Sequence, residues 1–398
     1  MPVKDSVTPY LDDLIAIRRD FHAHPELGFE ETRTAGIVAD KLQAYGVDEV
    51  HTGIAKTGVV GVVRGTGGGG GSNRAIGLRA DMDALPIAEV NDFAHKSTVG
   101  NKMHACGHDG HTTMLLGAAR WLADNRDAFD GTVYLVFQPA EEGHGGGRVM
   151  VQEGLFDRFP VEGVYGMHNM PGMPLGQIAM RSGPIMAATD EFQIRVEGKG
   201  SHAAMPQYSR DPILIGAHIV TALQSIASRR TDPIEQIVVS TTIFKGGDAF
   251  NVIPEYVELK GTVRTFLPDV RDLAETEMKR LVESIALGFD ASAQVAYIRN
   301  YPATVNTFEE TVLAAQAAKR IVGDDHVDEN AAPKMGGEDF AYMLNEKPGA
   351  YIFLGNGMPG EKGGHMVHTP QYDFNDDVMA YGISYWASLV ETALPVRT

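Results

Sequence analysis

The sequence predicts an α/β protein whose chain is interrupted by a smaller α+β domain. At both ends of the chain, short and almost continuous apolar runs alternate with amphipathic stretches. This pattern is typical of a largely parallel sheet covered by helices on both faces. In the middle, strands and helices follow in β-α-β-β-α-β order, the ferredoxin-like arrangement. We therefore expect residues 1–184 and 301–398 to form one domain and residues 185–300 the other.

The first third of the chain supplies the first helices and buried strands. Helices are expected over residues 10–22, 32–45 and 112–125. Strands are expected at four apolar runs, residues 59–63, 75–78, 133–137 and 164–167. The five-glycine run 67–71 lacks the Lys-Ser/Thr of a phosphate loop and precedes no helix, so we expect a surface connection there.

The middle segment has a different pattern. Phe192, Ile194 and Val196 alternate with polar residues, which indicates a strand with one exposed face. Asp211 and Asp269 are expected to cap the two helices, the first followed directly by a proline. Further strands are expected at residues 237–244, 256–266 and 293–297. After residue 300 the first pattern returns, with helices expected at 309–322 and 376–394 around a buried strand at 351–354.

Composition excludes several kinds of partner. The chain has 34 basic and 52 acidic residues among 398, a formal charge of −18. This balance argues against nucleic acid or an anionic membrane surface, because both attract basic proteins. The single cysteine, Cys106, fits a reducing compartment. We find no apolar run near the ~18 residues of a membrane span and no signal-peptide pattern, so we expect a cytoplasmic protein.

Three short stretches combine histidines with other metal ligands. They are residues 103–111, 141–144 and 166–169, and Asp81 and Asp83 stand at the end of a predicted strand nearby. Open parallel sheets bind ligands beyond the carboxyl ends of their strands. Clusters of cysteine, histidine and carboxylate are the set that transition metals select. The pattern therefore favours a metal site at one edge of the sheet.

Each of these residues also has an ordinary explanation. A single histidine at a strand end is usually a polar cap, a Glu-Glu pair is usually a solvated helix start, and a lone cysteine is usually a small buried hydrophobe. Three such coincidences at corresponding strand ends favour the metal instead. The donors are numerous enough for two ions, namely Cys106, His108, Glu142, His168 and His368. Glu141, beside Glu142, is the natural base for a water.

The sequence resembles the M20 metallopeptidase clan, specifically its amidohydrolase subfamily of hippurate hydrolases, N-acyl-amino-acid aminoacylases and auxin-conjugate hydrolases. The resemblance covers nearly the whole chain and is carried by residues 19–27, 78–86, 103–109, 138–142, 337–340 and 367–369. The Cys-Gly-His-Asp motif at 106–109 is specific to this subfamily, because other branches of the clan have aspartate where Cys106 stands.

The resemblance implies a role for each matching residue of the metal site. The five donors would be ligands of two divalent ions (Zn, Mn, Co or Ni), with Cys106 bridging. Glu141 would act as general base and then as acid. Asp83 would hold a ligand in place. The implied fold is a zinc-peptidase-like three-layer αβα catalytic domain with an inserted ferredoxin-like lid.

The resemblance also implies substrate-binding residues in the lid. His202 would meet the scissile carbonyl or the substrate carboxylate, and Asn251 and Arg264 match positions implicated in substrate binding. The alternatives are an ordinary turn at His202 or Asn251 and a surface ion pair for Arg264. Lids of this clan commonly pair subunits, so we expect at least a homodimer.

These features predict hydrolysis of the amide bond of N-acyl or N-aroyl L-amino acids. The alternatives are a related carboxypeptidase or an N-acetyl-diamino-acid deacetylase. A catalytically silent metal-binding protein is also consistent with the fold, since fold does not fix function. The intact Glu141 beside Glu142 argues against that last alternative.

Overall fold

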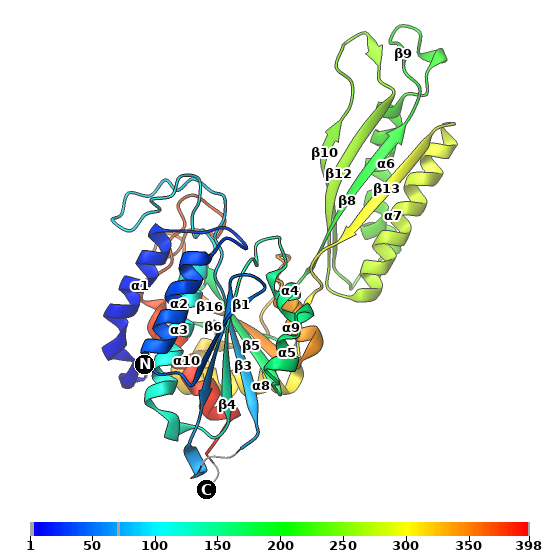
Figure 1. The fold of residues 1–398 in the computed structure, drawn as a ribbon. Helices are drawn as coiled ribbons and strands as arrows, with labels where there is room; N and C mark the ends of the chain where they lie inside the picture. Colours follow the sequence, from blue (N-terminus) through cyan, green and yellow to red (C-terminus); the bar gives the residue numbers. More distant parts are fainter. Residues whose placement is uncertain (1–3, 70–71, 397–398) are drawn as a thin grey trace. The chain divides into compact units, whose positions relative to one another are not determined.

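The computed structural model describes residues 4–69 and 72–396, so part of the glycine run 67–71 lies outside the described residues. The chain forms two compact units, coloured along the sequence in Figure 1. The first unit comprises the residues up to Ile185, Val305–Ala332 and the residues from Asp339 onward. The second unit comprises Met186–Thr304 and Pro333–Glu338. Within the described ranges, no helix has the length and apolar character needed to cross a bilayer.

An eight-stranded mixed sheet forms the centre of the first unit, in the order β1-β2-β4-β3-β5-β16-β6-β15. Strands β4, β3, β5 and β16 run parallel to one another, whereas β1 and β2 are antiparallel additions at one edge. The strands are β1 (Glu49–Ile54), β2 (Gly58–Arg64), β3 (Ala75–Asp81), β4 (Thr132–Gln138), β5 (Gly163–Pro171), β6 (Ile178–Ala179), β15 (Val327–Asp328) and β16 (Gly349–Gly357).

Helices cover both faces of this sheet and complete a three-layer αβα arrangement (Figure 1). One face carries α1 (Leu11–Ala23), α2 (Thr32–Ala44), α3 (His108–Asp124), α8 (Phe308–Val322) and α10 (Val378–Ala393). The other carries α4 (Gly146–Gln152), α5 (Leu155–Arg158) and α9 (Ala341–Glu346). Short 3-10 turns lie at Asp5–Tyr10, Gly67–Gly69, Arg126–Ala128 and Asp324–His326.

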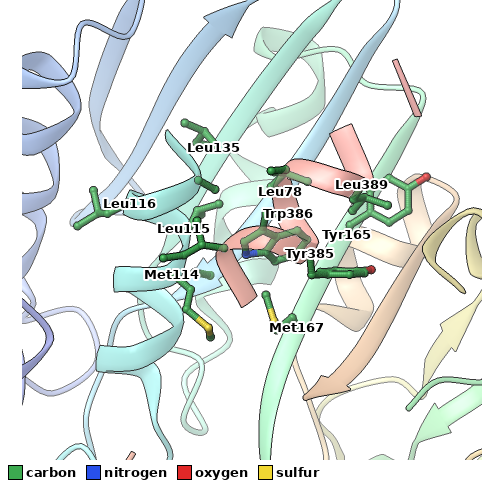
Figure 2. Packing of buried hydrophobic residues seen from close by; sticks show 14 of the residues in the cluster. Leu78, Met114, Leu115, Leu116, Leu135, Tyr165, Met167, Tyr385, Trp386 and Leu389 are labelled. Carbon is green, nitrogen blue, oxygen red and sulfur yellow. The ribbon is translucent and has the colours of Figure 1, made fainter. Parts of the chain in front are cut away.

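The main core lies between the sheet and the larger helical layer. Figure 2 shows Trp386 of α10 packed near Leu78 of β3 and Leu115 of α3, all of them almost fully buried. Helices α3 and α10 approach closely at Gly117, where an added Cβ would lie 2.5 Å from Ile383 Cδ1. This core makes the parallel strands and α3 a rigid support for the residues at their ends.

The second unit is an antiparallel four-stranded sheet in the order β10-β12-β8-β13. Its strands are β8 (Ala188–Glu197), β10 (Ile237–Lys245), β12 (Tyr256–Thr265) and β13 (Ser292–Arg299). Helices α6 (Pro212–Ser225) and α7 (Pro268–Gly288) pack on the face to which Phe192, Ile194 and Val196 point. A π-helical turn at Ile226–Arg230 extends α6, and Pro206–Tyr208 forms a 3-10 turn. Two further strand pairs are β9 (Ser201–His202) with β11 (Val252–Ile253), and β7 (Gly183–Met186) with β14 (Thr304–Asn306).

The two predicted helix caps have different outcomes. Asp211 is the N-cap of α6, and its carboxylate accepts hydrogen bonds from the backbone N–H groups of Ile213 and Leu214. The prediction for Asp269 is wrong. Helix α7 begins at Pro268, so Asp269 lies inside its first turn. Proline favours the first helical position, which explains the earlier start.

Candidate metal centre

The predicted ligands of the first unit meet at one edge of its sheet. Because β3, β4, β5 and β16 are parallel neighbours, their carboxyl ends lie side by side. Asp83 follows β3, Glu141 and Glu142 follow β4, and His168 lies within the last part of β5. His368 comes from the loop between β16 and α10. The sequence therefore delivers these donors to one place by ending several buried strands there.

Cys106 and His108 enter the site at the start of α3. The helix begins at His108, four residues before the predicted start at residue 112. Gly107 ends the preceding loop with φ +94, a conformation that favours glycine. A Cβ at Gly107 would lie 2.4 Å from Asn169 Nδ2, which donates a hydrogen bond to the Cys106 carbonyl at 2.8 Å. The glycine therefore lets this loop pack directly against the end of β5.

The thiol of Cys106 belongs to two adjacent groups of donors. One group combines it with His108 and His168, and the other with Glu142 and His368. Within each group the donor atoms all lie within 4.8 Å of one another. The sulfur lies 3.3 Å from His168 Nε2, and His368 Nε2 lies 3.2 Å from Glu142 Oε1. The arrangement thus offers two three-donor groups that share one sulfur.

The orientation of the histidine rings fits metal binding. His108 Nδ1 donates to the Asp83 carbonyl at 2.9 Å, and His168 Nδ1 donates to the Asn169 carbonyl at 2.6 Å. Each ring thereby presents Nε2 toward the other donors as the nitrogen that can coordinate a metal ion, while its Nδ1–H is held by a carbonyl, as is usual for metal-bound histidines. Among the described residues, His108 Nε2 is buried and makes no hydrogen bond. A buried nitrogen of this kind beside a thiol and a carboxylate fits a divalent transition-metal ion.

The charges around the donors favour a cation. Burial opposes the protonation of His108, but the nearby Asp81 carboxylate, together with Cys106 and Asp83, outweighs burial and raises the pKa of His108 well above its ordinary value. Burial raises the pKa of the Cys106 thiol, and the Glu142 carboxylate adds to this effect. Hydrogen bonds to Cys106 and Glu142 raise the pKa of His368 to about 10. The group of donors is therefore stabilised when it holds positive charge, such as that of a bound cation.

Asp83 supports the turn that presents the two glutamates. Its carboxylate accepts the backbone N–H of Glu141 and that of Glu142, each at 3.0 Å. A carboxylate oxygen of Glu141 lies within 4.8 Å of donor atoms of His108 and Glu142, but Glu141 belongs to neither group that contains Cys106. Glu141 is 6% exposed. Its Oε1 accepts the backbone N–H of Asp339 at 3.4 Å, so Glu141 is a buried carboxylate held next to the donors.

Asp81 and His111 form a buried pair beside the donors, and the sequence motifs that contain them do not specify this pairing. His111 Nδ1 donates to Asp81 at 2.6 Å, and its Nε2 accepts the backbone N–H of Asn169 at 3.0 Å. Both ring nitrogens are therefore occupied. Arg79 donates to the other Asp81 oxygen at 2.7 Å. The Asp81-Met82-Asp83 motif was the available signal, but it does not tell which aspartate faces which histidine.

A second buried cluster of charges surrounds Asp109, in the first turn of α3. Asp109 accepts a hydrogen bond from His22 Nδ1 at 2.9 Å, and His22 Nε2 donates to Glu89 at 3.2 Å. Arg18 lies 3.4 Å from Asp109 and donates to Asp376 at 2.8 Å. Burial opposes the protonation of His22, but the bonds to Asp109 and Glu89 outweigh it and raise the pKa of His22 to about 9. This cluster ties α1 to the first turn of α3 and to the loops that precede α3 and α10.

The second unit brings together two of the three predicted substrate-binding residues. His202 pairs with Val252, and the Asn251 carbonyl accepts the backbone N–H of Ala203 at 3.0 Å. His202 and Asn251 are both exposed. Figure 1 shows this strand pair beyond one end of the four-stranded sheet.

Arg264 lies far from the other two. It is near the end of β12 opposite Tyr256, the residue that leads back toward the β9–β11 pair. Arg264 lies eight positions along the extended strand from Tyr256, roughly 25 Å. Arg264 is half-buried and donates to Thr262 Oγ1 and the Val263 carbonyl, and no carboxylate among the described residues forms an ion pair with it. The alternative of a surface ion pair is therefore wrong.

The comparisons with known proteins agree on one family. The model described as peptidase family M20/M25/M40 matches residues 77–392. The chain is 41% identical to a hippurate hydrolase of Campylobacter jejuni over 373 residues, which are 94% of each chain. It is 38% identical to IAA-amino acid hydrolase ILR1-like 4 of Arabidopsis thaliana over 96% of this chain and 85% of that protein.

A solved structure extends the likeness to the fold of both units. It is the YXEP protein of Bacillus subtilis, described as a dinuclear metal-binding peptidase of the M20 family. The two structures have a TM-score of 0.83 at 33% identity, covering 96% of this chain and 98% of that one. The predicted family and fold class are thereby confirmed. The chain belongs to peptidase family M20/M25/M40 and is a metal-dependent amidohydrolase of that family.

Proposed function

We propose that this chain hydrolyses the amide bond of N-acyl or N-aroyl L-amino acids, with hippurate as a representative substrate. The products are a carboxylic acid and a free amino acid. The observation that carries the proposal is the buried Glu141 carboxylate, which lies beside two donor groups that share Cys106 without belonging to either of them. The names of the relatives, a hippurate hydrolase and an IAA-amino acid hydrolase, support this class of amide.

Five residues would hold the metal ions. Cys106, His108 and His168 would bind one, and Glu142 and His368 would bind the other together with the shared thiolate. Two divalent ions, when bound, supply Lewis acidity toward the substrate carbonyl and lower the pKa of water to about 7. A mixed sulfur, nitrogen and oxygen set suits Zn, Mn, Co or Ni. The thiol must stay reduced for this role, so we infer a reducing compartment such as the cytoplasm.

Glu141 moves the proton. Its carboxylate accepts a proton from the attacking water as the new C–O bond forms, and it then gives that proton to the amide nitrogen as the C–N bond breaks. Asp83 keeps the carboxylate in place through the backbone of the turn. Because Asp83 holds the turn through backbone N–H groups, it fixes the position of Glu141 without contacting the carboxylate that would carry the proton in both steps.

The lid residues would recognise the ends of the substrate. The guanidinium of Arg264 has a planar fork that matches a carboxylate and no carboxylate partner of its own among the described residues. His202 would donate a hydrogen bond to the developing oxyanion, with Asn251 beside it. A single lid is not expected to bring His202 and Arg264 to one small substrate, because roughly 25 Å of strand β12 lies between Arg264 and Tyr256, the end of the strand nearer the β9–β11 pair. This separation supports a homodimer in which each substrate meets residues of two lids.

The test is a substrate panel assayed on metal-free and reloaded enzyme. The protein is stripped with a chelator and reloaded separately with Zn, Mn, Co or Ni. N-Benzoyl, N-acetyl and indole-acetyl amino acids are then compared with peptides that carry a free amino terminus and with N-acetyl-diamino acids. We expect the N-acyl α-amino acids to be hydrolysed fastest with at least one metal, and chelation to abolish turnover. Faster release of C-terminal residues from peptides would instead favour the carboxypeptidase alternative, and no turnover with any metal would favour a silent binding protein.

A further inference from the structure

The turn that carries the glutamate pair has a strained residue at its start. Ala140, directly before Glu141, has φ +55, which places a non-glycine residue in the left-handed region. Residues other than glycine, asparagine and aspartate rarely adopt this conformation without outside support. The Ala140 carbonyl accepts the backbone N–H of Gly146 at 2.9 Å, which closes the turn on one side. The orientation of the Glu141 side chain therefore depends on the contacts that keep Ala140 in this backbone conformation.

Two buried carboxylates hold three consecutive backbone N–H groups of this turn. The Asp83 carboxylate accepts hydrogen bonds from the backbone N–H groups of Glu141 and Glu142. Oε1 of Glu31 accepts the third, from the backbone N–H of Ala140 at 2.8 Å. Its other oxygen accepts a hydrogen bond from the Thr57 hydroxyl at 2.6 Å. Glu31 thus bridges the strained residue to a second segment of the first unit.

Glu31 has no other evident task. It is 0% exposed, and no lysine, arginine or histidine among the described residues forms an ion pair with it. It precedes α2 but its side chain does not cap that helix. A buried carboxylate without a cation is costly, and burial raises the pKa of Glu31. Hydrogen bonds from the Thr57 hydroxyl, from the backbone N–H of Glu31 itself and from that of Ala140 offset part of this cost.

We propose that Glu31 is a positioning residue for the reaction. By holding the Ala140 N–H it keeps this residue in the left-handed conformation and thereby aims the Glu141 carboxylate at the reacting water. The inference rests on the proposed role of Glu141 as the base. It adds a residue of the α2 segment to the machinery, although that residue touches neither substrate nor metal donors.

The test compares three substitutions at this position with a matched control. Glu31→Gln keeps an oxygen that accepts the Ala140 N–H and an amide that donates to Thr57 Oγ1, so we expect kcat within about threefold of the wild type. Glu31→Ala removes the contact and Glu31→Asp withdraws it, and a displacement of about 1 Å costs up to 10²-fold. For both we expect kcat to fall by about 10-fold to 100-fold, with KM within twofold and metal content unchanged. Glu30→Ala is the control, because Glu30 is exposed and pairs only with Lys102 at 3.1 Å among the contacts described.

Several results would overturn the inference. They are a normal kcat for Glu31→Ala, a kcat loss matched by loss of metal, or a Glu31→Gln variant as slow as Glu31→Ala, which would make the charge rather than the hydrogen bond decisive. If Glu31→Ala fails to fold, Glu31→Asp and Glu31→Gln carry the same comparison. The double variant Glu31→Ala/Glu141→Gln should be no slower than Glu141→Gln alone. A normal rate for Glu141→Gln defeats the proposed base, whereas a slow Glu141→Gln with a normal Glu31→Ala defeats only the inference about Glu31.

Discussion

The two sheets of this molecule present their functional residues in opposite ways. In the first unit, β3 is buried along its whole length and β16 likewise, because helices cover both faces. In the second unit, β8 alternates between buried and more exposed residues, since only one face is covered. Polar donors at the end of a buried strand therefore stand out, whereas polar residues along a half-exposed strand do not. The difference shows why the metal donors were recognisable as chemistry and the lid residues only by resemblance.

The contrast extends to the energetics of polar groups. In the first unit the charged residues near the donors are buried and hydrogen-bonded to one another, as in the cluster around Asp109. In the second unit ion pairs such as Arg195 with Glu197 are exposed to solvent. Buried groups lose much when one partner is removed, whereas exposed pairs contribute little. Removing a charged side chain should therefore lower the stability strongly near the donors of the first unit, and only slightly at exposed pairs of the second.

The largest expected effect lies at the metal edge of the first unit. Glu141→Gln should lower turnover by about 10²-fold to 10⁴-fold, because a positioned acid–base group contributes that much. Metal content, measured by elemental analysis, should stay at the wild-type value since Glu141 is not a donor in either group with Cys106. A fully metallated Glu141→Gln enzyme with near-normal turnover would remove Glu141 as the base.

The second prediction concerns the pH dependence of stability in the first unit. Folding raises the pKa of His22 from an ordinary 6.5 to about 9, so the stabilisation by its charge is complete below pH 6.5 and is lost as pH rises through about 9. The deficit in unfolding free energy of His22→Gln relative to the wild type should thus shrink by roughly 3 kcal/mol between pH 6 and pH 10. Urea denaturation at both pH values measures it.

The control for His22 is His51→Gln, because His51 is partly exposed, pairs with the exposed Glu49 at 3.0 Å and packs its ring against Phe159. Its deficit should be small at both pH values. An equal deficit for His22→Gln at pH 6 and pH 10 would show that folding does not raise the pKa of His22, and the buried cluster would then resemble the second unit in its energetics.

The third prediction tests recognition by the lid. Arg264→Ala should lower kcat/KM for N-acyl amino acids by about 10-fold to 100-fold, since losing a contact to a charged group costs roughly 1.5–3 kcal/mol. The corresponding amides lack the carboxylate and should be spared. Arg195→Ala, on the same sheet but already paired with Glu197, is the control.

His202→Ala distinguishes the two lid roles. It should lower kcat for acids and amides alike, because its proposed target is the oxyanion. Equal losses on acid and amide for Arg264→Ala would reject carboxylate recognition, and an unchanged kcat for His202→Ala would reject the oxyanion contact.

The smallest expected effect is at the N-cap of α6. Asp211→Ala should destabilise the second unit by about 1 kcal/mol, the usual cost of losing a helix cap, while Asp211→Asn should retain most of the stability. Thermal unfolding is the measurement, and kcat should not change. A loss of several kcal/mol would mean that Asp211 supports more than the first turn of its helix.

Sequence patterns predicted the buried strands and the segments that bear the donors, because long apolar runs and short-range motifs are local features. The edge strand β1 was missed because most of its residues are partly or fully exposed. The early start of α3 was missed because Gly107 acts through its backbone conformation and its packing against Asn169. The bond between Glu31 and Ala140 joins residues 109 positions apart, which no local pattern can specify. The roughly 25 Å between Arg264 and Tyr256 at the two ends of β12 likewise follows from the length of the strand, which no motif specifies.

The distance between His202 and Arg264 has a genetic consequence. If each reaction uses Arg264 from one copy and His202 from the other, a dimer that pairs a His202→Ala copy with an Arg264→Ala copy contains one damaged site and one intact site. Two individually weak proteins would then complement each other when mixed, up to about a quarter of wild-type activity for random exchange of subunits. A lid that served only its own chain would give no recovery at all.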